Sequence, residues 1–264
     1  METHITRIVP EECIANIISN TSPRDACRLS LVSRGFKIAA ASNLAASSSS
    51  SSSSLNMLPK KDLYFHLCDN RTLIGNGNMM STKHYLTFAI NKWSGKKCYM
   101  LGARELSISW GDTEYDWQWI SSSKFSEVAH LWLLWWLEII GSVETKILSP
   151  NTTYGVYFIY TIAQLPKNNM YFNTSPYGLF HPMKVSLSIE NDIEEHQETD
   201  LLDRKDGFHA RERTCGWRLR IGEFFNGDEN NVLQMHLWET EAGESKSGLL
   251  VHGIELRPKE EKNY

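Results

Sequence analysis

The chain has 264 residues, of which 41% are hydrophobic and 22% charged, with a formal net charge of −4. This composition can bury a sizeable core, in one large domain or two modest ones, and excludes a chain disordered throughout. The acidic balance argues against nucleic acid or an anionic membrane as partners, and no apolar run is long enough to insert into a bilayer. Five scattered cysteines without CxxC spacing indicate reduced thiols rather than disulfides or a zinc site. We therefore expect a cytoplasmic or nuclear protein with no cofactor and no metal.

The N-terminal segment has the pattern of short helices. Pro10 suits a first helical position, and apolar residues recur at helical spacing after it, at Cys13, Ile14, Ile17 and Ile18. The string "SPRD", with Ser22 as N-cap and Pro23 next, predicts the start of a second helix. An apolar face continues beyond it through Cys27, Leu31, Val32, Phe36 and Ala39. So small a unit has a marginal core, which favours packing against a partner.

A run of eight serines, residues 47–54, divides the chain. Serine cannot bury enough apolar area to offset its ordering entropy, so this run predicts a flexible linker. We expect a helical domain over residues 1–46, a linker over 47–60 and a larger domain over 61–264, with its core at about 93–258.

The larger domain has the pattern of β-strands. The strings "KVSLSI", "WRLRI" and "VLQMHLW" alternate apolar and polar residues, and "YGVYFIYTIA" (residues 154–163) is a continuous apolar run typical of a central strand. Further strands are expected in "CYMLGARELSIS" and "SGLLVHGIELRP", whereas residues 190–213 are charge-rich and predict an exposed loop. The fold class is therefore a multi-domain α + β chain whose C-terminal part is an antiparallel β-sandwich.

Three tryptophans stand close together in the acidic string "SWGDTEYDWQW". They either belong to the core or offer flat rings on which a ligand stacks. Trp119 lies two residues after Trp117 on an extended segment and is a core candidate. Core or interface packing is also the default expectation for the other tryptophans of the larger domain, namely Trp93, Trp132, Trp135, Trp136 and Trp217.

Two sets of strings carry a resemblance to a known family. "IVPEECIANIISNTSPRDACRLSLVSRGFKIAAAS" resembles the F-box of plant F-box proteins whose C-terminal half is similar to phloem protein 2 and the tobacco-type lectins. The second half carries "KWSGKKCYMLGARELSISWGDTEYDWQW", "WLEIIGSVETKILSPNTTYGVYFIY", "GWRLRIGEFFN" and "KSGLLVHGIELRP". The resemblance implies a jelly-roll-like lectin sandwich behind an F-box. The F-box is shortened, because the serine run replaces the "W-E-x-F-L-P-x-D-Y" segment of the family.

The resemblance also implies the partner of the F-box. In this family it docks onto a Skp-type adaptor within a cullin-RING (SCF) ubiquitin ligase. The matching positions are Pro10, Ile14, Ile17, Leu31, Val32 and Phe36. An exposed apolar helical face suits such burial, although the same residues can instead form the unit's own small core.

For the sandwich, the resemblance implies binding of N-acetylglucosamine-containing glycans through paired tryptophans and acidic residues. Aromatic rings pack on the apolar face of a pyranose, and carboxylates accept hydrogen bonds from its hydroxyls. The matching positions are Trp110, Trp117 and Glu239. A second family glutamate falls on Val232, which cannot accept such bonds.

No catalytic signature such as GxSxG, a P-loop or HExxH occurs, so we expect a non-catalytic protein. The favoured hypothesis is a substrate receptor of an SCF-type ligase that recognises a glycoprotein or another target. Two alternatives stay open. One is a stand-alone lectin with a vestigial F-box, and the other is a protein-interaction module that has lost sugar binding.

Overall fold

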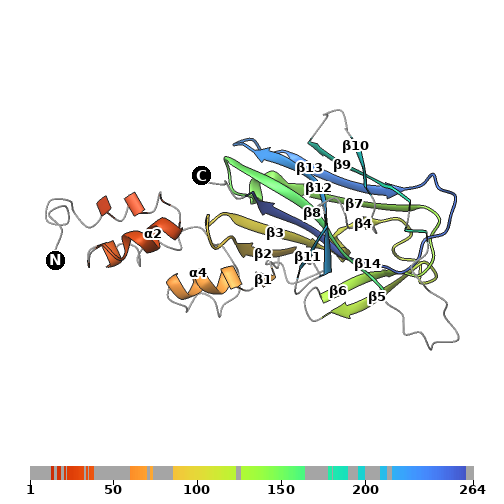
Figure 1. Ribbon diagram of the computed structural model, residues 1–264, viewed down its shortest axis with the longest axis horizontal. Helices are drawn as coiled ribbons and strands as arrows, with labels where there is room; N and C mark the ends of the chain where they lie inside the picture. Colours follow the sequence, from red (N-terminus) through yellow and green to blue (C-terminus); the bar gives the residue numbers. More distant parts are fainter. Residues whose placement is uncertain are drawn as a thin grey trace, which may run out of the picture. The chain divides into compact units, whose positions relative to one another are not determined.

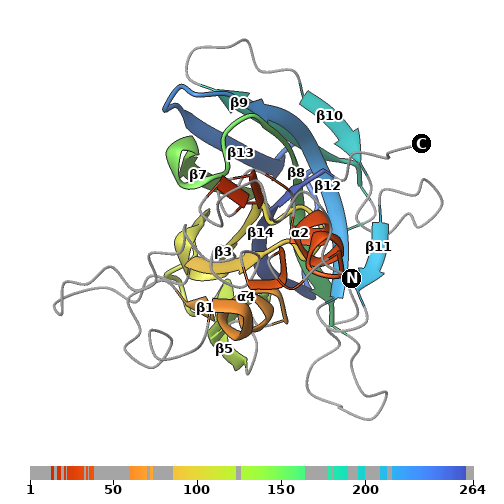
Figure 2. The ribbon, with the colours of Figure 1, turned by 90° about the vertical axis from the view of Figure 1, so that its left-hand side faces the viewer.

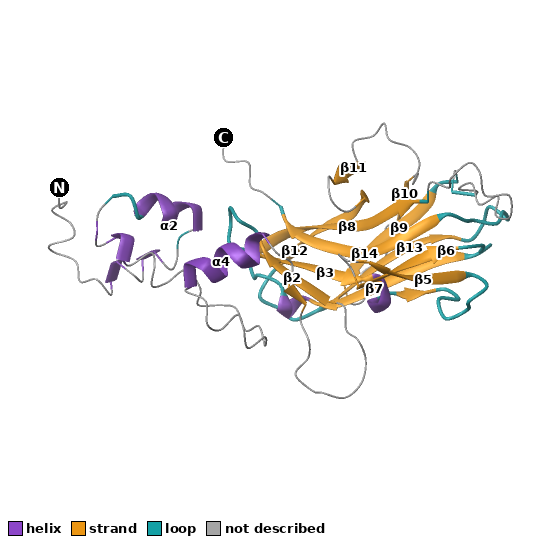
Figure 3. Ribbon diagram, turned by 90° about the horizontal axis from the view of Figure 1, so that it is seen from below, coloured by secondary structure: helices purple, strands orange, loops and turns teal. Residues whose placement is uncertain are grey.

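The computed structural model describes residues 13–14, 17–18, 21, 23–32, 34, 36–38, 60–69, 72–73, 86–122, 126–163, 178–179, 181–189, 196–199, 209–212 and 216–259. The chain forms two compact units. The N-terminal unit comprises Met1–Ser81, Phe88–Cys98 and Glu260–Tyr264, and the sandwich unit comprises Thr82–Thr87 and Tyr99–Lys259. The longer helices belong to the first unit and nearly all strands to the second (Figure 3).

The N-terminal unit contains helices α2 (Pro23–Leu29) and α4 (Lys60–Asp69) and the short strand β1 (Thr72–Leu73), which pairs with β2 (Leu86–Ile90). Helix α2 begins at a proline, as its sequence predicts, with Asp25 in the first turn and Arg28 in the last, where both complement the helix dipole. The Arg28 guanidinium lies 3.4 Å from the Asp25 carboxylate. The pattern "SPRD" therefore does mark a helix start.

The described residues before the predicted linker form a small apolar cluster. Its buried members are Ile14, Ile18 and Ala26, and Leu29 and Phe36 pack against them. Ile14 and Ile18 stand one helical turn apart, so they face the same side, as the apolar spacing predicts. The predicted linker, residues 47–60, lies outside the described residues except for Lys60, which begins α4.

The sandwich unit is built from two antiparallel sheets, confirming the expected fold class (Figure 1). The first sheet runs β3 (Lys97–Gly102), β14 (Leu249–Pro258), β8 (Thr152–Ile162), β12 (Gly216–Asn226) and β11 (His209–Glu212), with the hairpin β5 (Trp117–Ser122) and β6 (Ser126–Leu131) pairing along β14. The second runs β10 (His196–Thr199), β9 (Met183–Ile189), β13 (Val232–Glu239), β7 (Leu137–Glu144) and β4 (Ser107–Ile108). Two short 3-10 helices, η3 (Ala103–Glu105) and η4 (Thr145–Ile147), complete it.

The two sheets pack face to face around the core (Figure 2). A Cβ added to Gly141 of β7 would lie 3.0 Å from the Ile254 side chain of β14. One added to Gly222 of β12 would lie 3.1 Å from Leu187 of β9. Contacts this close mean that the glycines let the sheets approach each other, and an alanine at either position would require the facing Ile254 or Leu187 side chain to shift.

Most predicted strands are present, and one predicted loop is not. The apolar run 154–163 lies in β8, between β14 and β12, where it is buried on both faces as a central strand should be. The charge-rich segment 190–213 was expected to be a loop, yet it contains edge strands β10 and β11. Edge strands are enriched in charged residues that discourage pairing with other chains, which explains why their pattern resembles a loop.

Candidate functional site

Strand register brings three loops of the sandwich unit to one place. Strand β4 pairs with β7 so that Ile108 lies opposite Ile139. The loop that leaves β4, residues 109–116, therefore runs beside the loop that enters β7, residues 132–136. An antiparallel bridge between Leu134 and Lys246 adds a third loop, residues 240–248. We call these three loops the loop end of the sandwich.

Trp110 is the exposed tryptophan of the first loop. Its side chain is 65% exposed, and its backbone has a φ of 59°, in the left-handed region. Two other indoles hold the turn that carries it. Trp117 Nε1 donates to the carbonyl oxygen of Ser109 at 3.0 Å, and Trp119 Nε1 donates to that of Gly111 at 2.9 Å. The carbonyls on either side of Trp110 are thus both fixed by buried or half-buried rings.

The predicted pairing of Trp110 with Trp117 as two stacking rings needs correction. Trp117 is only 2% exposed and lies opposite Leu131, which is also buried, so its ring offers no face to a ligand. Trp119, expected in the core, is half-buried, with the Arg104 guanidinium 3.5 Å above its ring. Trp117 and Trp119 differ in burial, as the period-two alternation predicts. However, Trp117 is the buried ring and Trp119 the partly exposed one, which is the reverse of the expectation. The pairing of β5 with β6 turns Trp117 inward, and no local pattern reveals this.

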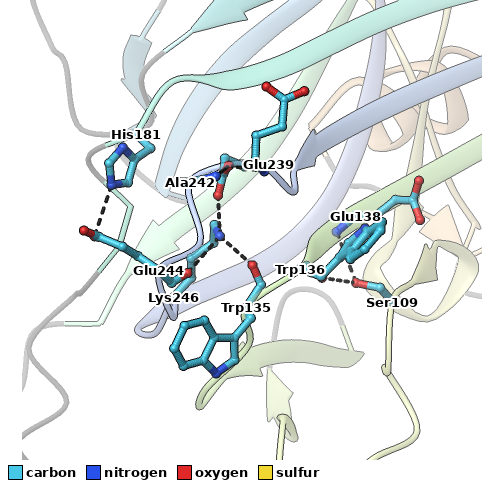
Figure 4. A network of polar contacts seen from close by, with 10 residues as sticks. Ser109, Trp135, Trp136, Glu138, His181, Glu239, Ala242, Glu244 and Lys246 are labelled. Carbon is cyan, nitrogen blue, oxygen red and sulfur yellow. Dashed lines mark hydrogen bonds and ion pairs between the residues drawn. The ribbon is translucent and has the colours of Figure 1, made fainter.

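The tryptophans of the second loop were expected to be core or interface residues. Trp135 and Trp136 are instead 62% and 58% exposed. Their backbone is nevertheless fixed, because the Trp136 carbonyl accepts from Ser109 Oγ at 3.0 Å and the Trp135 carbonyl accepts from Lys246 Nζ at 2.8 Å. Figure 4 shows the Trp135 indole pointing away from Lys246 while its carbonyl oxygen faces the ammonium group. Sequence reasoning missed both residues as site candidates.

The remaining tryptophans that were expected in the core also differ in their exposure to solvent. Trp93, in the N-terminal unit, is exposed, whereas Trp132 and Trp217 are half-buried. A tryptophan-rich segment alone therefore did not reveal which rings reach solvent.

Glu239, expected to contact a sugar, is a buried structural residue. It is 5% exposed and forms an ion pair with Lys246, which is fully buried. Its carboxylate also accepts hydrogen bonds from the backbone N–H groups of Glu241 at 2.9 Å and Ala242 at 2.7 Å. Figure 4 shows the Lys246 ammonium among Glu239, Trp135 and Glu244, and it also donates to the Glu244 carbonyl. Because the carboxylate bonds to Lys246 and to two backbone N–H groups of the third loop, it stabilises the conformation of that loop.

The environment of Glu239 also sets its pKa. Burial by itself would raise the pKa, but the hydrogen bonds from Lys246, Ala242 and Glu241 and the Lys246 charge outweigh burial and lower the pKa below 4.5. A carboxyl whose pKa is lower in the folded state stabilises the fold above its unfolded pKa, and this stabilisation is lost as the pH falls through the folded pKa.

This gives a prediction for acid denaturation. Glu239→Gln should lose free energy of unfolding relative to the wild type at neutral pH, and the difference should shrink as the pH falls below about 4.5. Urea denaturation followed by circular dichroism between pH 3 and 7 measures it. A difference that stays constant over this range would show that the Glu239 charge does not stabilise the fold. Glu241→Gln, at an exposed carboxylate of the same loop, is the control.

Val232, the position of the missing family glutamate, lies far from the loop end. It begins β13, opposite Glu144, whereas Glu239 ends that strand. At roughly 3.3 Å per residue, the two positions are about 23 Å apart. The valine therefore removes no acceptor from the neighbourhood of Trp110.

The first and third loops of the loop end also carry carboxylates. Glu241 pairs with Lys184, and Glu244 lies 3.1 Å from His181. Asp112 and Glu114, both exposed on the Trp110 loop, have no ion-pair partner among the residues that the structure describes. They are the carboxylates of this loop that are available to an incoming ligand.

The residues expected to bind the adaptor fall into two groups. Ile14 is buried and Phe36 half-buried in the core of the N-terminal unit, whereas Ile17, Leu31 and Val32 are exposed. Leu31, at 87%, is the most exposed of them. Pro10 lies outside the described residues. Ile14 and Phe36 thus belong to an internal cluster, and the other three side chains are accessible to a partner.

Two features are absent from the described part of the chain. No group of three or more His, Cys, Asp or Glu side chains there is placed to hold a metal ion. No helix found there has both the length and the apolar content needed to cross a membrane.

Comparison with known proteins agrees with the two units. Residues 8–44 match the family "F-box domain" and residues 96–258 match the family "Phloem protein 2". Putative F-box protein PP2-B12 of Arabidopsis thaliana is 35% identical, with 96% of this chain and 97% of that protein covered. F-box protein PP2-B1 of the same plant is 33% identical, with 95% of this chain and 89% of that protein covered.

Among solved structures, the CBM22-1 xylan-binding domain from Paenibacillus barcinonensis Xyn10C superposes with a TM-score of 0.32 at 12% identity, covering 60% of this chain and 87% of that one. This likeness is too weak to carry an argument. The two domain matches and the full-length relatives together show that the chain belongs to the family of F-box proteins with a C-terminal phloem protein 2 domain.

Proposed function

We propose that this protein is the substrate-recognition subunit of an SCF-type cullin-RING ubiquitin ligase. The N-terminal unit docks onto a Skp-type adaptor, and the sandwich unit binds the target. The observation that carries the proposal is the exposed apolar set Ile17, Leu31 and Val32 within the region that matches the F-box domain. The names of the relatives, F-box proteins of the PP2-B type, support the same role.

The adaptor half of the proposal rests on the energetics of these side chains. Ile14, Ile18 and Ala26 form a buried cluster of the region that matches the F-box domain, while Ile17, Leu31 and Val32 of the same region stay exposed. Exposed side chains such as Leu31 gain roughly 1.5–3 kcal/mol each when fully buried. A complementary apolar groove on a partner supplies that burial.

The target half rests on the loop end of the sandwich. Exposed tryptophans beside unpaired carboxylates suit the alternating apolar and hydroxyl surfaces of a sugar. We propose an N-acetylglucosamine-containing glycan, carried by a glycoprotein, as the ligand. The protein itself transfers no group in this scheme; ubiquitin transfer belongs to other subunits of the ligase.

The proposal places the protein in the cytoplasm or nucleus. The described cysteines Cys13, Cys68 and Cys98 are free thiols, which agrees with a reducing compartment. Imaging of a fluorescent fusion of the full chain would contradict this placement if the signal lay in the secretory pathway.

Adaptor binding gives a direct test of the first half. Leu31→Asp together with Val32→Asp should weaken binding of a purified Skp-type adaptor by roughly thirtyfold or more, because buried interface anchors are worth about 2 kcal/mol or more. The fold should survive, since both side chains are exposed. Biolayer interferometry with the full-length chain measures the affinity.

The matched control is Phe225→Asp, a charge placed on an exposed apolar residue of the sandwich unit. It should leave adaptor affinity unchanged. A wild-type chain that captures no adaptor would contradict the ligase role and leave a stand-alone lectin as the remaining reading.

A further inference from the structure

We propose that Trp110, Trp135 and Trp136 together form one preorganised platform that contacts the glycan. This inference rests on the proposed glycan-binding function and deepens it. It assigns two contact residues, Trp135 and Trp136, and gives the family position Trp117 a supporting role. Four features of the loop end carry it.

The first feature is the exposure of three large rings on adjoining loops. Trp110, Trp135 and Trp136 are each more than half exposed, and none of these rings forms a hydrogen bond or ring contact within the described part of the chain. Single exposed apolar residues are ordinary on a protein surface, but grouped ones mark binding sites. Strand register and the Ser109 bond to the Trp136 carbonyl bring the loops that carry these three together.

The second feature is that the backbone beneath each ring is fixed. The Trp117 and Trp119 indoles hold the carbonyls on either side of Trp110. Ser109 Oγ donates to the Trp136 carbonyl and also accepts from the backbone N–H of Glu138 at 3.1 Å. A platform fixed in this way loses little conformational entropy on binding, which favours affinity for a small ligand.

The clamp on Trp135 is a buried charge. Lys246 is fully buried, paired with Glu239, and donates to the Trp135 carbonyl (Figure 4). A buried lysine is costly unless every donor is satisfied, so its use to fix an exposed loop is unusual for a segment with only a structural role.

The third feature is the backbone conformation of Trp110. A bulky residue at a φ of 59° is rare, because its Cβ crowds the following carbonyl. Glycine would adopt this turn without that cost. A tryptophan at a position where glycine fits better indicates that the ring itself is needed.

The fourth feature is the presence of hydrogen-bond acceptors on the loop that carries Trp110. Glu239 and Glu241 are already paired with lysines, and Glu244 with His181. On the Trp110 loop, Asp112 and Glu114 are exposed and have no ion-pair partner among the described residues. The rings offer flat surfaces to the apolar face of a pyranose, and the two carboxylates accept hydrogen bonds from its hydroxyls. Rings and carboxylates also attract a cationic chain, so the experiment includes a lysine-rich peptide as the competing occupant.

The experiment is calorimetric titration of the folded, full-length chain with chitotriose, a trimer of N-acetylglucosamine. Trp110→Gly, Trp135→Ala and Trp136→Ala should each weaken binding about tenfold or more, because each removes one stacking surface. Phe225→Ala removes an equally exposed ring elsewhere on the sandwich and should change nothing. Circular dichroism confirms that each variant is folded.

A second variant tests the supporting role of Trp117. Trp117→Phe keeps an aromatic ring but removes the N–H that holds Ser109, so binding should weaken severalfold. In a Trp110→Gly background the same change should have little further effect, since it acts through Trp110. Equal effects in both backgrounds would show that Trp117 acts independently of Trp110 and would overturn its supporting role.

The remaining outcomes separate this inference from the proposed function. If the wild type binds chitotriose and the Trp135 and Trp136 variants bind equally well, the platform is wrong while glycan binding stands. If the wild type binds no chitotriose but binds a lysine-rich peptide through the same rings, both the platform for sugars and the glycan ligand are overturned. Adaptor binding is measured separately and is affected by neither result.

Discussion

Trp117→Ala is expected to destabilise the sandwich unit by about 3–5 kcal/mol, the usual cost of deleting a large buried aromatic side chain. Trp117 is among the largest fully buried side chains of the described residues, and its indole also holds the Ser109 carbonyl. Trp110→Ala should change the free energy of unfolding by only about 0.5 kcal/mol or less, because its ring is exposed. The two tryptophans that the family resemblance pairs should therefore behave oppositely.

Urea denaturation of the full chain, followed by the fluorescence of the remaining tryptophans and by circular dichroism, measures both values. Trp119→Ala is an intermediate case, since its half-buried ring packs under Arg104. Equal stability of the Trp117 and Trp110 variants would contradict the burial of Trp117. Because Trp117→Ala affects folding, a loss of sugar binding in that variant cannot be attributed to a lost contact.

Lys246→Met is expected to cost about 3–5 kcal/mol, since removing one partner of a buried ion pair leaves the other charge uncompensated. The change leaves the Glu239 carboxylate without its ion-pair partner and removes the Lys246 hydrogen bond to the carbonyl of Trp135. Lys184→Met makes the same substitution at a pair whose glutamate, Glu241, is exposed, and it should cost less than about 1 kcal/mol.

Chemical denaturation of the two variants side by side measures this difference. The double variant Lys246→Met with Glu239→Leu should recover much of the lost stability, because replacing a whole buried ion pair with apolar residues is often neutral. The stability of the double variant should not return fully to the wild-type value, because the backbone N–H groups of Glu241 and Ala242 lose their acceptor. If Lys246→Met lowered the free energy of unfolding no more than Lys184→Met, the buried ion pair would not stabilise the loop end.

The burial of the family glutamate changes how variants at this position are interpreted. Glu239→Ala would disturb Lys246 and, through it, the carbonyl of Trp135. A sugar-binding defect in that variant would then report a displaced platform rather than a missing acceptor. Asp112→Asn and Glu114→Gln are the better substitutions for testing carboxylate acceptors, since both side chains are exposed.

The strands were predictable because their signal is local. In a sandwich each strand buries one face, so β13 shows Leu233, Met235 and Leu237 inward at a period of two, and the sequence displays the same alternation. Strand β8 is buried on both faces and shows a continuous apolar run instead. The division into a helical N-terminal unit and a β-rich C-terminal unit follows from the same local patterns.

The candidate site was predictable only in part. Trp110 could be identified as an exposed candidate through the family resemblance, but the exposure of Trp135 and Trp136 depends on how two loops meet between β4 and β7. The inward turn of Trp117 depends on the pairing of β5 with β6. The roles of Glu239 and Lys246 depend on the bridge between Leu134 and Lys246, more than a hundred residues apart in sequence.

The sequence by itself therefore determined most elements of this protein, apart from edge strands β10 and β11, since propensity and hydrophobic period act over a few neighbouring residues. Only the tertiary structure decided which rings face solvent and which charges are buried, because burial depends on partners that are distant in the chain. The loop end illustrates the difference. Its exposed tryptophans and its buried ion pair are ordinary residues in sequence and acquire their roles only when three separate loops are brought together.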